Sequence, residues 1–140
     1  MTRTIGSICG SLRENSYNRI IAQSLIDMVD SYQFRWIEIN DLPLFNEDLE
    51  ISGVPETVTS FKSAIQDADG IIIVSPEYNS GMPNVLKNAL DWASRPPESA
   101  VLTKKPVGLG RQSAERERIS EIKLLLLGFC KIWTLISLSF

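Results

Sequence analysis

Two polar loops carry most of the side chains that could bind a charged or aromatic ligand. The first follows an apolar run and reads Gly10-Ser-Leu-Arg-Glu-Asn-Ser-Tyr-Asn18. The hydroxyls of Ser11 and Ser16, the guanidinium of Arg13 and the amide of Asn18 suit a phosphate. A helix that begins here would add free N–H groups. The alternative interpretation is that Ser16 simply caps this helix. The loop has neither the Gly-Lys-Ser/Thr ending of a P-loop nor the G-x-G-x-x-G pattern.

The second loop runs from Ser75 to Pro83 and follows another apolar run. Its two prolines, Pro76 and Pro83, restrict the backbone. Between them, Tyr78 and Asn79 offer an aromatic face and an amide whose donors and acceptors could meet a flat heterocycle. The alternative is an ordinary strand-to-helix connection that happens to be polar.

The composition of the chain excludes several kinds of chemistry. Its 140 residues include no histidine, which excludes Ser-His-Asp and Cys-His catalysis and a histidine-liganded zinc site. A net charge of −3 argues against binding to nucleic acid. The two cysteines, Cys9 and Cys130, are too few and too far apart for a disulfide framework. We therefore expect a reducing, cytoplasmic setting, and the N-terminus has no signal-peptide pattern.

The elements that must position the two loops alternate regularly along the chain. Apolar runs predict strands over 4–9, 32–39, 70–75 and 104–110, helical periods predict helices over 16–29, 55–68 and 84–94, and acidic residues around Pro43 predict a loop over 41–50. This order predicts one doubly wound α/β domain with a parallel sheet. Ligands of such sheets bind beyond the carboxyl ends of the strands, where the strand order reverses, and the loops after the first and third strands lie there.

Other candidate residues have simpler structural interpretations. In the first helix, Ile21, Leu25 and Met28 share one face and are expected to pack inward. Cys9 is expected to be a small buried apolar residue, and Trp92 a packing residue or subunit contact. The carboxylates of Glu47, Asp48 and Glu50 are interpreted as a solvated acidic loop rather than as metal ligands or an acid/base cluster.

Together these segments resemble the NADPH-dependent FMN reductase family, which includes flavodoxin-like quinone, azo-dye and chromate reductases. The matching strings are residues 10–18, residues 41–48, Pro76-Glu-Tyr-Asn79, Pro83 and residues 86–92. The resemblance covers residues 3–110 and implies a flavodoxin-like α/β/α sandwich with strand order 2-1-3-4. It also implies that the FMN phosphate is held by Ser11, Arg13, Ser16, Tyr17 and Asn18, and that the isoalloxazine ring is lined by Pro76, Glu77, Tyr78 and Asn79.

The resemblance implies an enzyme that transfers two electrons from NADPH or NADH through FMN to quinone-like, azo or metal-oxyanion acceptors. It also implies a homodimer or homotetramer. Because the flavin carries the redox chemistry, no catalytic side chain and no metal ligand is nominated. Two alternatives remain open at this point: a flavin-binding electron carrier, and a truncated, inactive relative that keeps the FMN loops.

Residues 111–140 form a tail that diverges from the family pattern. A helix over 114–127 and a β-prone segment over 129–140 would make it a shortened substitute for the missing part of the fold, including the fifth strand. A shifted reading frame is the alternative. The apolar stretch over 124–140 is shorter than the roughly 20 residues of a membrane-spanning helix, so no membrane role is expected.

Overall fold

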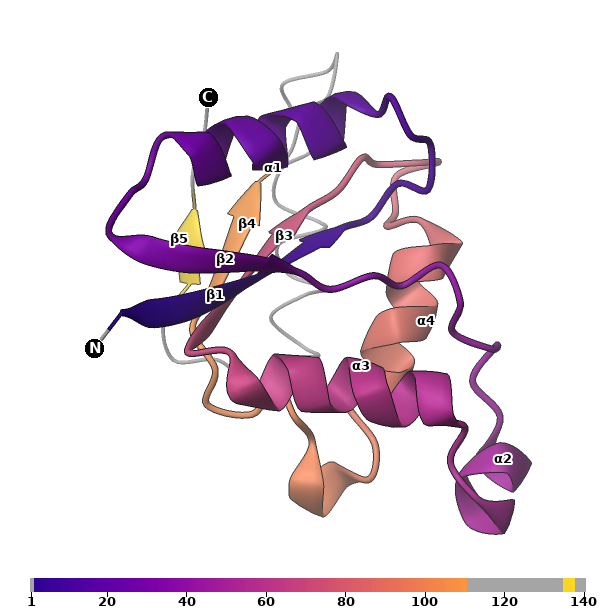
Figure 1. The fold of residues 1–140 in the computed structure, drawn as a ribbon. Helices are drawn as coiled ribbons and strands as arrows, with labels where there is room; N and C mark the ends of the chain where they lie inside the picture. The colour runs from indigo at the N-terminus through magenta and orange to yellow at the C-terminus, as the bar shows by residue number, and fades with distance from the viewer. Residues whose placement is uncertain (1, 111–134, 138–140) are drawn as a thin grey trace.

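The computed structural model describes residues 2–110 and 135–137, which contain a parallel sheet flanked by helices. The strand order is β2-β1-β3-β4-β5. The strands are β1 (Arg3–Cys9), β2 (Tyr32–Trp36), β3 (Gly70–Val74), β4 (Val107–Gly110) and β5 (Leu135–Ser137). The helices are α1 (Tyr17–Asp27), α2 (Glu47–Ser52), α3 (Glu56–Asp67) and α4 (Asn84–Ala93), with a 3₁₀ turn η1 (Pro97–Ser99). Helix α1 lies on one side of the sheet, and α3 and α4 lie on the other (Figure 1).

This arrangement confirms the predicted doubly wound α/β sandwich. Each pair of neighbouring strands is parallel, and the order reverses between β1 and β3. β5 pairs with β4 inside the segment that was predicted to be β-prone, so the tail supplies the fifth strand. The helix predicted over 114–127 lies outside the described residues.

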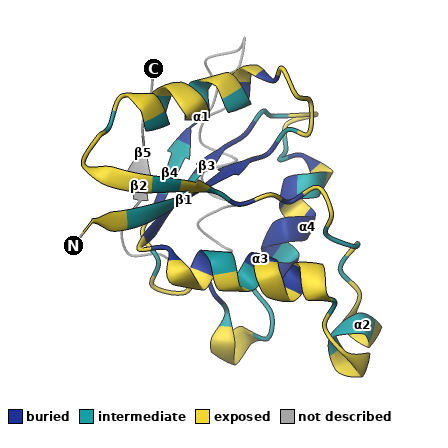
Figure 2. Cartoon of the chain, viewed as in Figure 1, coloured by how far each residue is buried: buried dark blue, intermediate teal, exposed yellow. Residues whose placement is uncertain are grey.

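The core is built between the sheet and the helices α3 and α4. In β3, Ile71 and Ile73 are only 1 % exposed on one face of the sheet, while on the other face Val74 is fully buried and Ile72 is half-buried, so both faces of the strand are covered. Helix α4 buries an apolar stripe made of Leu86, Ala89, Leu90 and Ala93, and Figure 2 shows the buried positions of this helix in dark blue. Full burial of each such aliphatic side chain stabilises the fold by about 1.5–3 kcal/mol.

The prediction of a loop over residues 41–50 is confirmed for residues 41–46 and wrong for residues 47–50, because α2 begins at Glu47. The side chain of Asn46 accepts a hydrogen bond from the N–H of Asp48, at 2.9 Å, and so caps the helix. The acidic residues that suggested a solvated loop occupy the first turn of α2, where the helix dipole favours negative charge.

The predicted inward face of the first helix is also partly wrong. Helix α1 ends at Asp27, and Met28 beyond it is 79 % exposed. Ala22 and Asn18 are the fully buried residues of this helix, whereas Ile21 and Leu25 are half-buried. The helix therefore contacts the sheet through small and polar side chains as well as its aliphatic ones.

Candidate functional site

The carboxyl ends of β1, β3 and β4 lie side by side, and the two polar loops leave the sheet there. The N–H of Gly10 donates to the carbonyl of Val74 at 2.9 Å, and the N–H of Ser75 donates to that of Gly110 at 3.1 Å. A Cβ on Gly10 would lie 2.2 Å from Oγ of Ser75. The first loop therefore needs glycine at this position so that it can start against the second loop.

The first loop leads directly into the amino-terminal end of α1. Ser16 is buried, and its N–H donates to the carbonyl of Arg13 at 3.0 Å. Ser16 holds the capping position of α1, but its side chain makes no capping hydrogen bond. The first turn contains no acidic residue, so no helix carboxylate offsets the positive end of the dipole. The interpretation of Ser16 as only a cap therefore lacks its defining bond.

The remaining first-loop residues differ in exposure. Arg13 and Tyr17 are exposed, and the guanidinium of Arg13 lies 5.8 Å from the centroid of the Tyr17 ring. Asn18 is buried on the first turn of α1. Ser11 lines a cavity of about 490 Å³ that opens between this loop and residues 38–41. The five predicted phosphate residues thus occupy one loop and one helix turn, with the exposed guanidinium of Arg13 on the outside.

The second loop closes on itself in a two-residue turn. Tyr78 and Gly81 exchange two backbone hydrogen bonds, at 2.9 and 3.0 Å. Asn79 and Ser80 between them have φ of 51° and 61°, the combination of a type I′ turn. Tyr78 is 55 % exposed at the tip. The turn gives the loop a defined shape without help from a ligand.

A cavity of about 660 Å³ lies against this turn. It is lined by Glu77, Tyr78, Asn79, Met82, Pro83 and Asn84. Three of the four predicted ring-lining residues therefore face one space. Pro76 is not among the lining residues, and its carbonyl instead accepts a hydrogen bond from the Ser75 hydroxyl at 2.9 Å.

Helix α4 also holds a segment whose contact with this helix the sequence did not predict. Residues 42–45, here called the strap, lie along α4. Oδ1 of Asn88 accepts from the N–H of Phe45 at 2.7 Å, and Nδ2 donates to the carbonyl of Pro43 at 2.9 Å. The indole N–H of Trp92 donates to the same carbonyl at 2.8 Å. The signal available in the sequence was Asn88 itself, an amide inside an apolar helical stripe.

Trp92 and Cys9 have the structural roles that were predicted for them. Trp92 is fully buried and makes an edge-on contact with Phe45, with ring centroids 4.9 Å apart. Cys9 is buried with a free thiol, and burial raises its pKa above the ordinary value of 9.0. Neither side chain is thus placed for redox or stacking chemistry.

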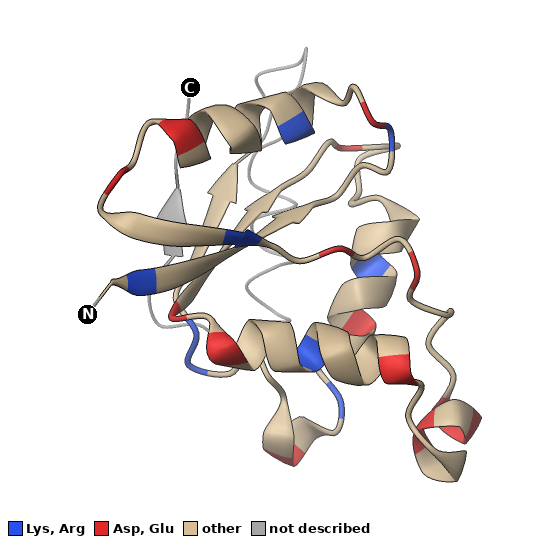
Figure 3. Ribbon diagram, viewed as in Figure 1, with Lys and Arg blue, Asp and Glu red and all other residues tan. Residues whose placement is uncertain are grey.

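The acidic residues of α2 serve as structural anchors. Arg95 pairs with Glu47 at 3.1 Å and with Glu50 at 2.8 Å, which fastens α2 to the end of α4. The side chain of Glu50 is only 13 % exposed, so the expectation of a solvated cluster is wrong for this residue. Figure 3 shows the concentration of acidic residues on α2. Across the part of the chain that the structure describes, no group of three or more potential ligands could hold a metal ion.

Within residues 2–110 and 135–137, no helix combines the length and the apolar character needed to cross a membrane.

Comparisons with known proteins agree with this geometry. Residues 3–134 match the family model described as NADPH-dependent FMN reductase, so the match extends past residue 110 into the tail. A 2-hydroxy-1,4-benzoquinone reductase from a Burkholderia species is 47 % identical over 107 residues, which are 76 % of this chain and 58 % of that protein. The chain spans between half and three fifths of the length of the curated relatives it matches.

Two solved structures extend the comparison to the fold. The flavoenzyme NAD(P)H:(acceptor) oxidoreductase FerB from Paracoccus denitrificans superposes with a TM-score of 0.83 and 28 % identity, covering 99 % of this chain and 76 % of that one. A flavodoxin, WrbA-like protein from Agrobacterium tumefaciens has a TM-score of 0.60 at 18 % identity, over 96 % of this chain and 77 % of that one. The fold is flavodoxin-like. The chain belongs to the NADPH-dependent FMN reductase family.

Proposed function

We propose that this member of the FMN reductase family binds FMN across the carboxyl ends of β1 and β3. There it transfers two electrons from NADPH or NADH to a small acceptor of the quinone class. The observation that carries the proposal is the close approach of the two polar loops at Gly10 and Ser75, because one loop is suited to a phosphate and the other to a flat ring. The family match and the quinone-reducing relative support the activity.

The first loop fits the phosphate of FMN. A phosphate monoester carries about −1.5 to −2 charges at neutral pH. The amino-terminal end of α1 and the exposed guanidinium of Arg13 supply positive charge at one place, and the Ser16 side chain makes no bond to the helix end. We assign the phosphate to Ser11, Arg13, Ser16, Tyr17 and Asn18.

The second loop fits a flat heterocycle. Its cavity of about 660 Å³ lies within the range of about 300–1,000 Å³ that is usual for small-molecule sites. The type I′ turn presents Tyr78 and Asn79 beside this space, and we assign the isoalloxazine ring to Pro76, Glu77, Tyr78 and Asn79. When bound, FMN would supply the hydride and electron chemistry, while the protein binds the cofactor, orients it and sets its electrostatic surroundings. We assign no catalytic side chain.

The proposal extends to the range of acceptors, the oligomeric state and the location of the protein. Azo compounds and metal oxyanions are two-electron acceptors that the same open face could receive, and we include them in the proposed substrate range. We also propose a homodimer or homotetramer. Leu44 on the strap and Ile51 on α2 are 80 % and 79 % exposed and would be covered by a second copy. A free buried thiol at Cys9 and only two cysteines in the chain favour a reducing, cytoplasmic location.

An FMN titration followed by a nicotinamide nucleotide tests the proposal. We expect saturable quenching of FMN fluorescence by the full chain and a rise in its melting temperature, since saturation to 100 times Kd adds about 2.7 kcal/mol. Anaerobic NADPH or NADH should then bleach the flavin, and a benzoquinone should restore its colour. Unchanged fluorescence and melting temperature at tens of micromolar FMN would refute cofactor binding. Binding without bleaching by either nucleotide would identify an electron carrier instead.

A further inference from the structure

Helix α1 carries the turn assigned to the FMN phosphate, yet no large aliphatic side chain of this helix is fully buried. Its buried residues are Asn18 and Ala22, whereas Ile20, on the first turn, is 52 % exposed. Packing of an apolar face supplies most of what holds a helix in a protein. Contacts of another kind therefore help to set the position of the first turn of α1.

A cluster of side chains ties α1 to the end of β2. The guanidinium of Arg19 donates to the carboxylate of Glu38 at 2.8 Å, with a longer second bond at 3.5 Å, and lies 4.4 Å from the centroid of the Trp36 ring. The indole N–H of Trp36 donates to Oε1 of Gln23 at 3.3 Å. Arg19 and Gln23 are four positions apart and so lie on one face of α1. These four residues, Arg19, Gln23, Trp36 and Glu38, are here called the clamp.

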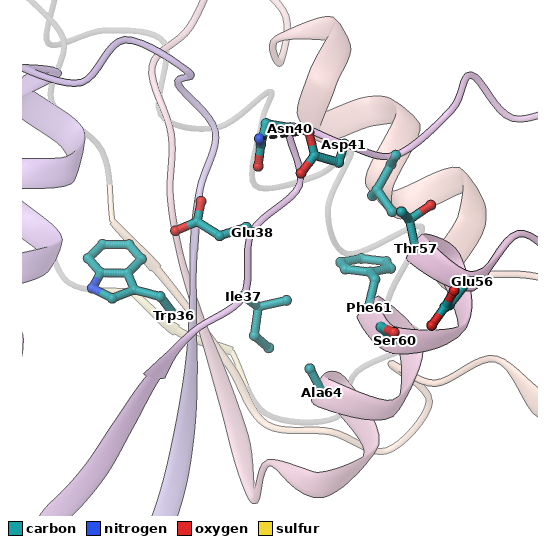
Figure 4. Close-up of a pocket in the computed structure, with 11 residues that line it drawn as sticks. Trp36, Ile37, Glu38, Asn40, Asp41, Glu56, Thr57, Ser60, Phe61 and Ala64 are labelled. Atoms are coloured by element: carbon teal, nitrogen blue, oxygen red, sulfur yellow. Dashed lines mark hydrogen bonds between the residues drawn. The ribbon is translucent and has the colours of Figure 1, made fainter.

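The segment that carries two of the clamp residues is itself held in place. Trp36 and Glu38 point to one side of this segment, and Ile37 points to the other side, toward Phe61 of α3 (Figure 4). Ile37 is buried, and its N–H donates to the carbonyl of Ser7 at 2.9 Å. A cavity of about 420 Å³ lies between this segment and α3. The clamp therefore fastens α1 to backbone that is already bonded to β1.

The clamp also lies next to the first loop. Arg19 and Glu38 line the same cavity of about 490 Å³ as Ser11, and Arg19 directly follows Asn18 in the chain. The charge of the Arg19 guanidinium is paired with Glu38, so it is not offered to an anion in the way that the charge of Arg13 is. The side chains of this ion pair are 36 % and 56 % exposed, so the pair acts together with the ring of Trp36 rather than alone.

We propose that Arg19 and Trp36 are positioning residues for the FMN phosphate. They hold the first turn of α1 in the direction in which its N–H groups meet the phosphate, and they act through the helix rather than by contact with the cofactor. This inference rests on the proposed function. A helix end that is held in place before binding loses less conformational entropy when the ligand arrives, which raises the affinity.

Comparison of FMN with riboflavin, which lacks the phosphate, tests the proposal on the full chain. In fluorescence titrations, Trp36→Ala should weaken FMN binding by about fivefold or more and change riboflavin binding by less than about twofold. Trp36→Phe keeps an aromatic face for Arg19 and should recover most of the FMN affinity. The control is Arg35→Gln, at an exposed position next to Trp36 on β2, and it should bind both flavins as the wild type does. Equal losses for the two flavins in Trp36→Ala, or unchanged FMN binding, would overturn the proposal.

Arg19→Lys distinguishes positioning from a direct effect of charge. Lysine keeps the positive charge, but it cannot donate two bonds to a carboxylate while lying flat on a ring. We therefore expect Arg19→Lys to weaken FMN binding by about threefold and Arg19→Ala to weaken it by about fivefold or more. Full FMN affinity in Arg19→Lys, together with a loss in Arg19→Ala, would mean that Arg19 acts through its charge and would refute its role in positioning.

Amide hydrogen exchange without any flavin separates this inference from the proposed function. The N–H of Ile20 donates to the carbonyl of Ser16 at 3.0 Å and so reports on the first turn of α1. In Trp36→Ala this amide should exchange at least about fivefold faster than in the wild type, while the amides of β3 keep their rates. A wild-type chain that binds no FMN would refute the proposed function. Unchanged exchange at Ile20 would refute the clamp even if FMN binds.

Discussion

The contact between Gly10 and Ser75 can be tested by adding one methyl group. In Gly10→Ala the new Cβ would lie 2.2 Å from Oγ, 2.7 Å from Cβ and 3.2 Å from Cα of Ser75. Rotation of the serine side chain relieves only the first of these clashes, because the other two atoms are fixed by the backbone. The substitution must therefore move one loop away from the other.

The expected loss of stability follows from the two clashes that the serine side chain cannot relieve by rotating. Overpacking of this kind costs about 1–3 kcal/mol. Replacing glycine by alanine also lowers the conformational entropy of the unfolded chain, which offsets about 0.4–1 kcal/mol of this cost. We expect a net fall of about 1–2 kcal/mol in the free energy of unfolding, measured by urea denaturation with circular dichroism and no cofactor present. FMN affinity should fall as well, because both loops contribute to the proposed site.

Two further variants make this prediction specific. Gly81→Ala is the matched control, since the nearest atom to its Cβ is the carbonyl of Tyr78 at 3.8 Å, and it should be as stable as the wild type or slightly more so. Combining Ser75→Gly with Gly10→Ala removes the clashes with Oγ and Cβ of Ser75. The free energy of unfolding of this double variant should be about 1 kcal/mol higher than the sum of the two single effects predicts. The reasoning fails if Gly10→Ala unfolds at the wild-type urea concentration, or if Gly81→Ala loses as much stability.

Three other substitutions test separate parts of the molecule. Arg13→Ala should weaken FMN binding by about 1.5–3 kcal/mol in a fluorescence titration, the cost of a charge-assisted bond, while the exposed control Arg35→Ala should leave the affinity unchanged. Asn88→Ala should lower the free energy of unfolding by about 2–4 kcal/mol in urea, because it removes the side chain that binds the strap at three atoms; an unchanged midpoint would deny the strap any role in stability. In a Cys130→Ser background, Cys9 should react with a thiol reagent only as the protein unfolds. Rapid reaction of Cys9 in the native protein would contradict its burial. Because burial raises the pKa of the folded thiol, the stabilisation from keeping this thiol neutral is complete below pH 9.0, the pKa of the unfolded thiol. It is lost as the pH rises through the pKa of the folded thiol.

The parts of the fold that the sequence predicted correctly are those with a strong periodic signal. The apolar run of β3 could only be a strand covered on both faces, and the stripe of α4 could only face the core. The meeting of the two loops followed from the sheet order alone, because the carboxyl ends of neighbouring parallel strands share one edge. The positions of the candidate residues in these loops were therefore accessible before any coordinates.

The features that escaped prediction depend on contacts between distant segments. Helix α2 is short and contains no apolar period, so only the bond from Asp48 to Asn46 and the pairing of Glu50 with Arg95 reveal it. The sequence analysis assigned no role to Asn88, because its partners on the strap lie more than 40 residues away along the chain. The cavity between the segment after β2 and helix α3 likewise combines residues 36–42 with residues 56–64, and no local pattern relates the two.

The pairing of β1 with β3 has a consequence for how the protein folds. The two loops meet at the end of the β1–β3 pair, in which Ile5 lies opposite Gly70, 65 positions further along the chain. The β1–β2 pair joins residues that are closer in sequence, such as Arg3 and Tyr32. Contacts of such long range form slowly, because the intervening chain must be ordered first. The β1–α1–β2 unit can form early, but the loop after β1 and the loop after β3 come together only when β3 docks. A ligand that bridges both loops should therefore slow unfolding while leaving the folding rate nearly unchanged.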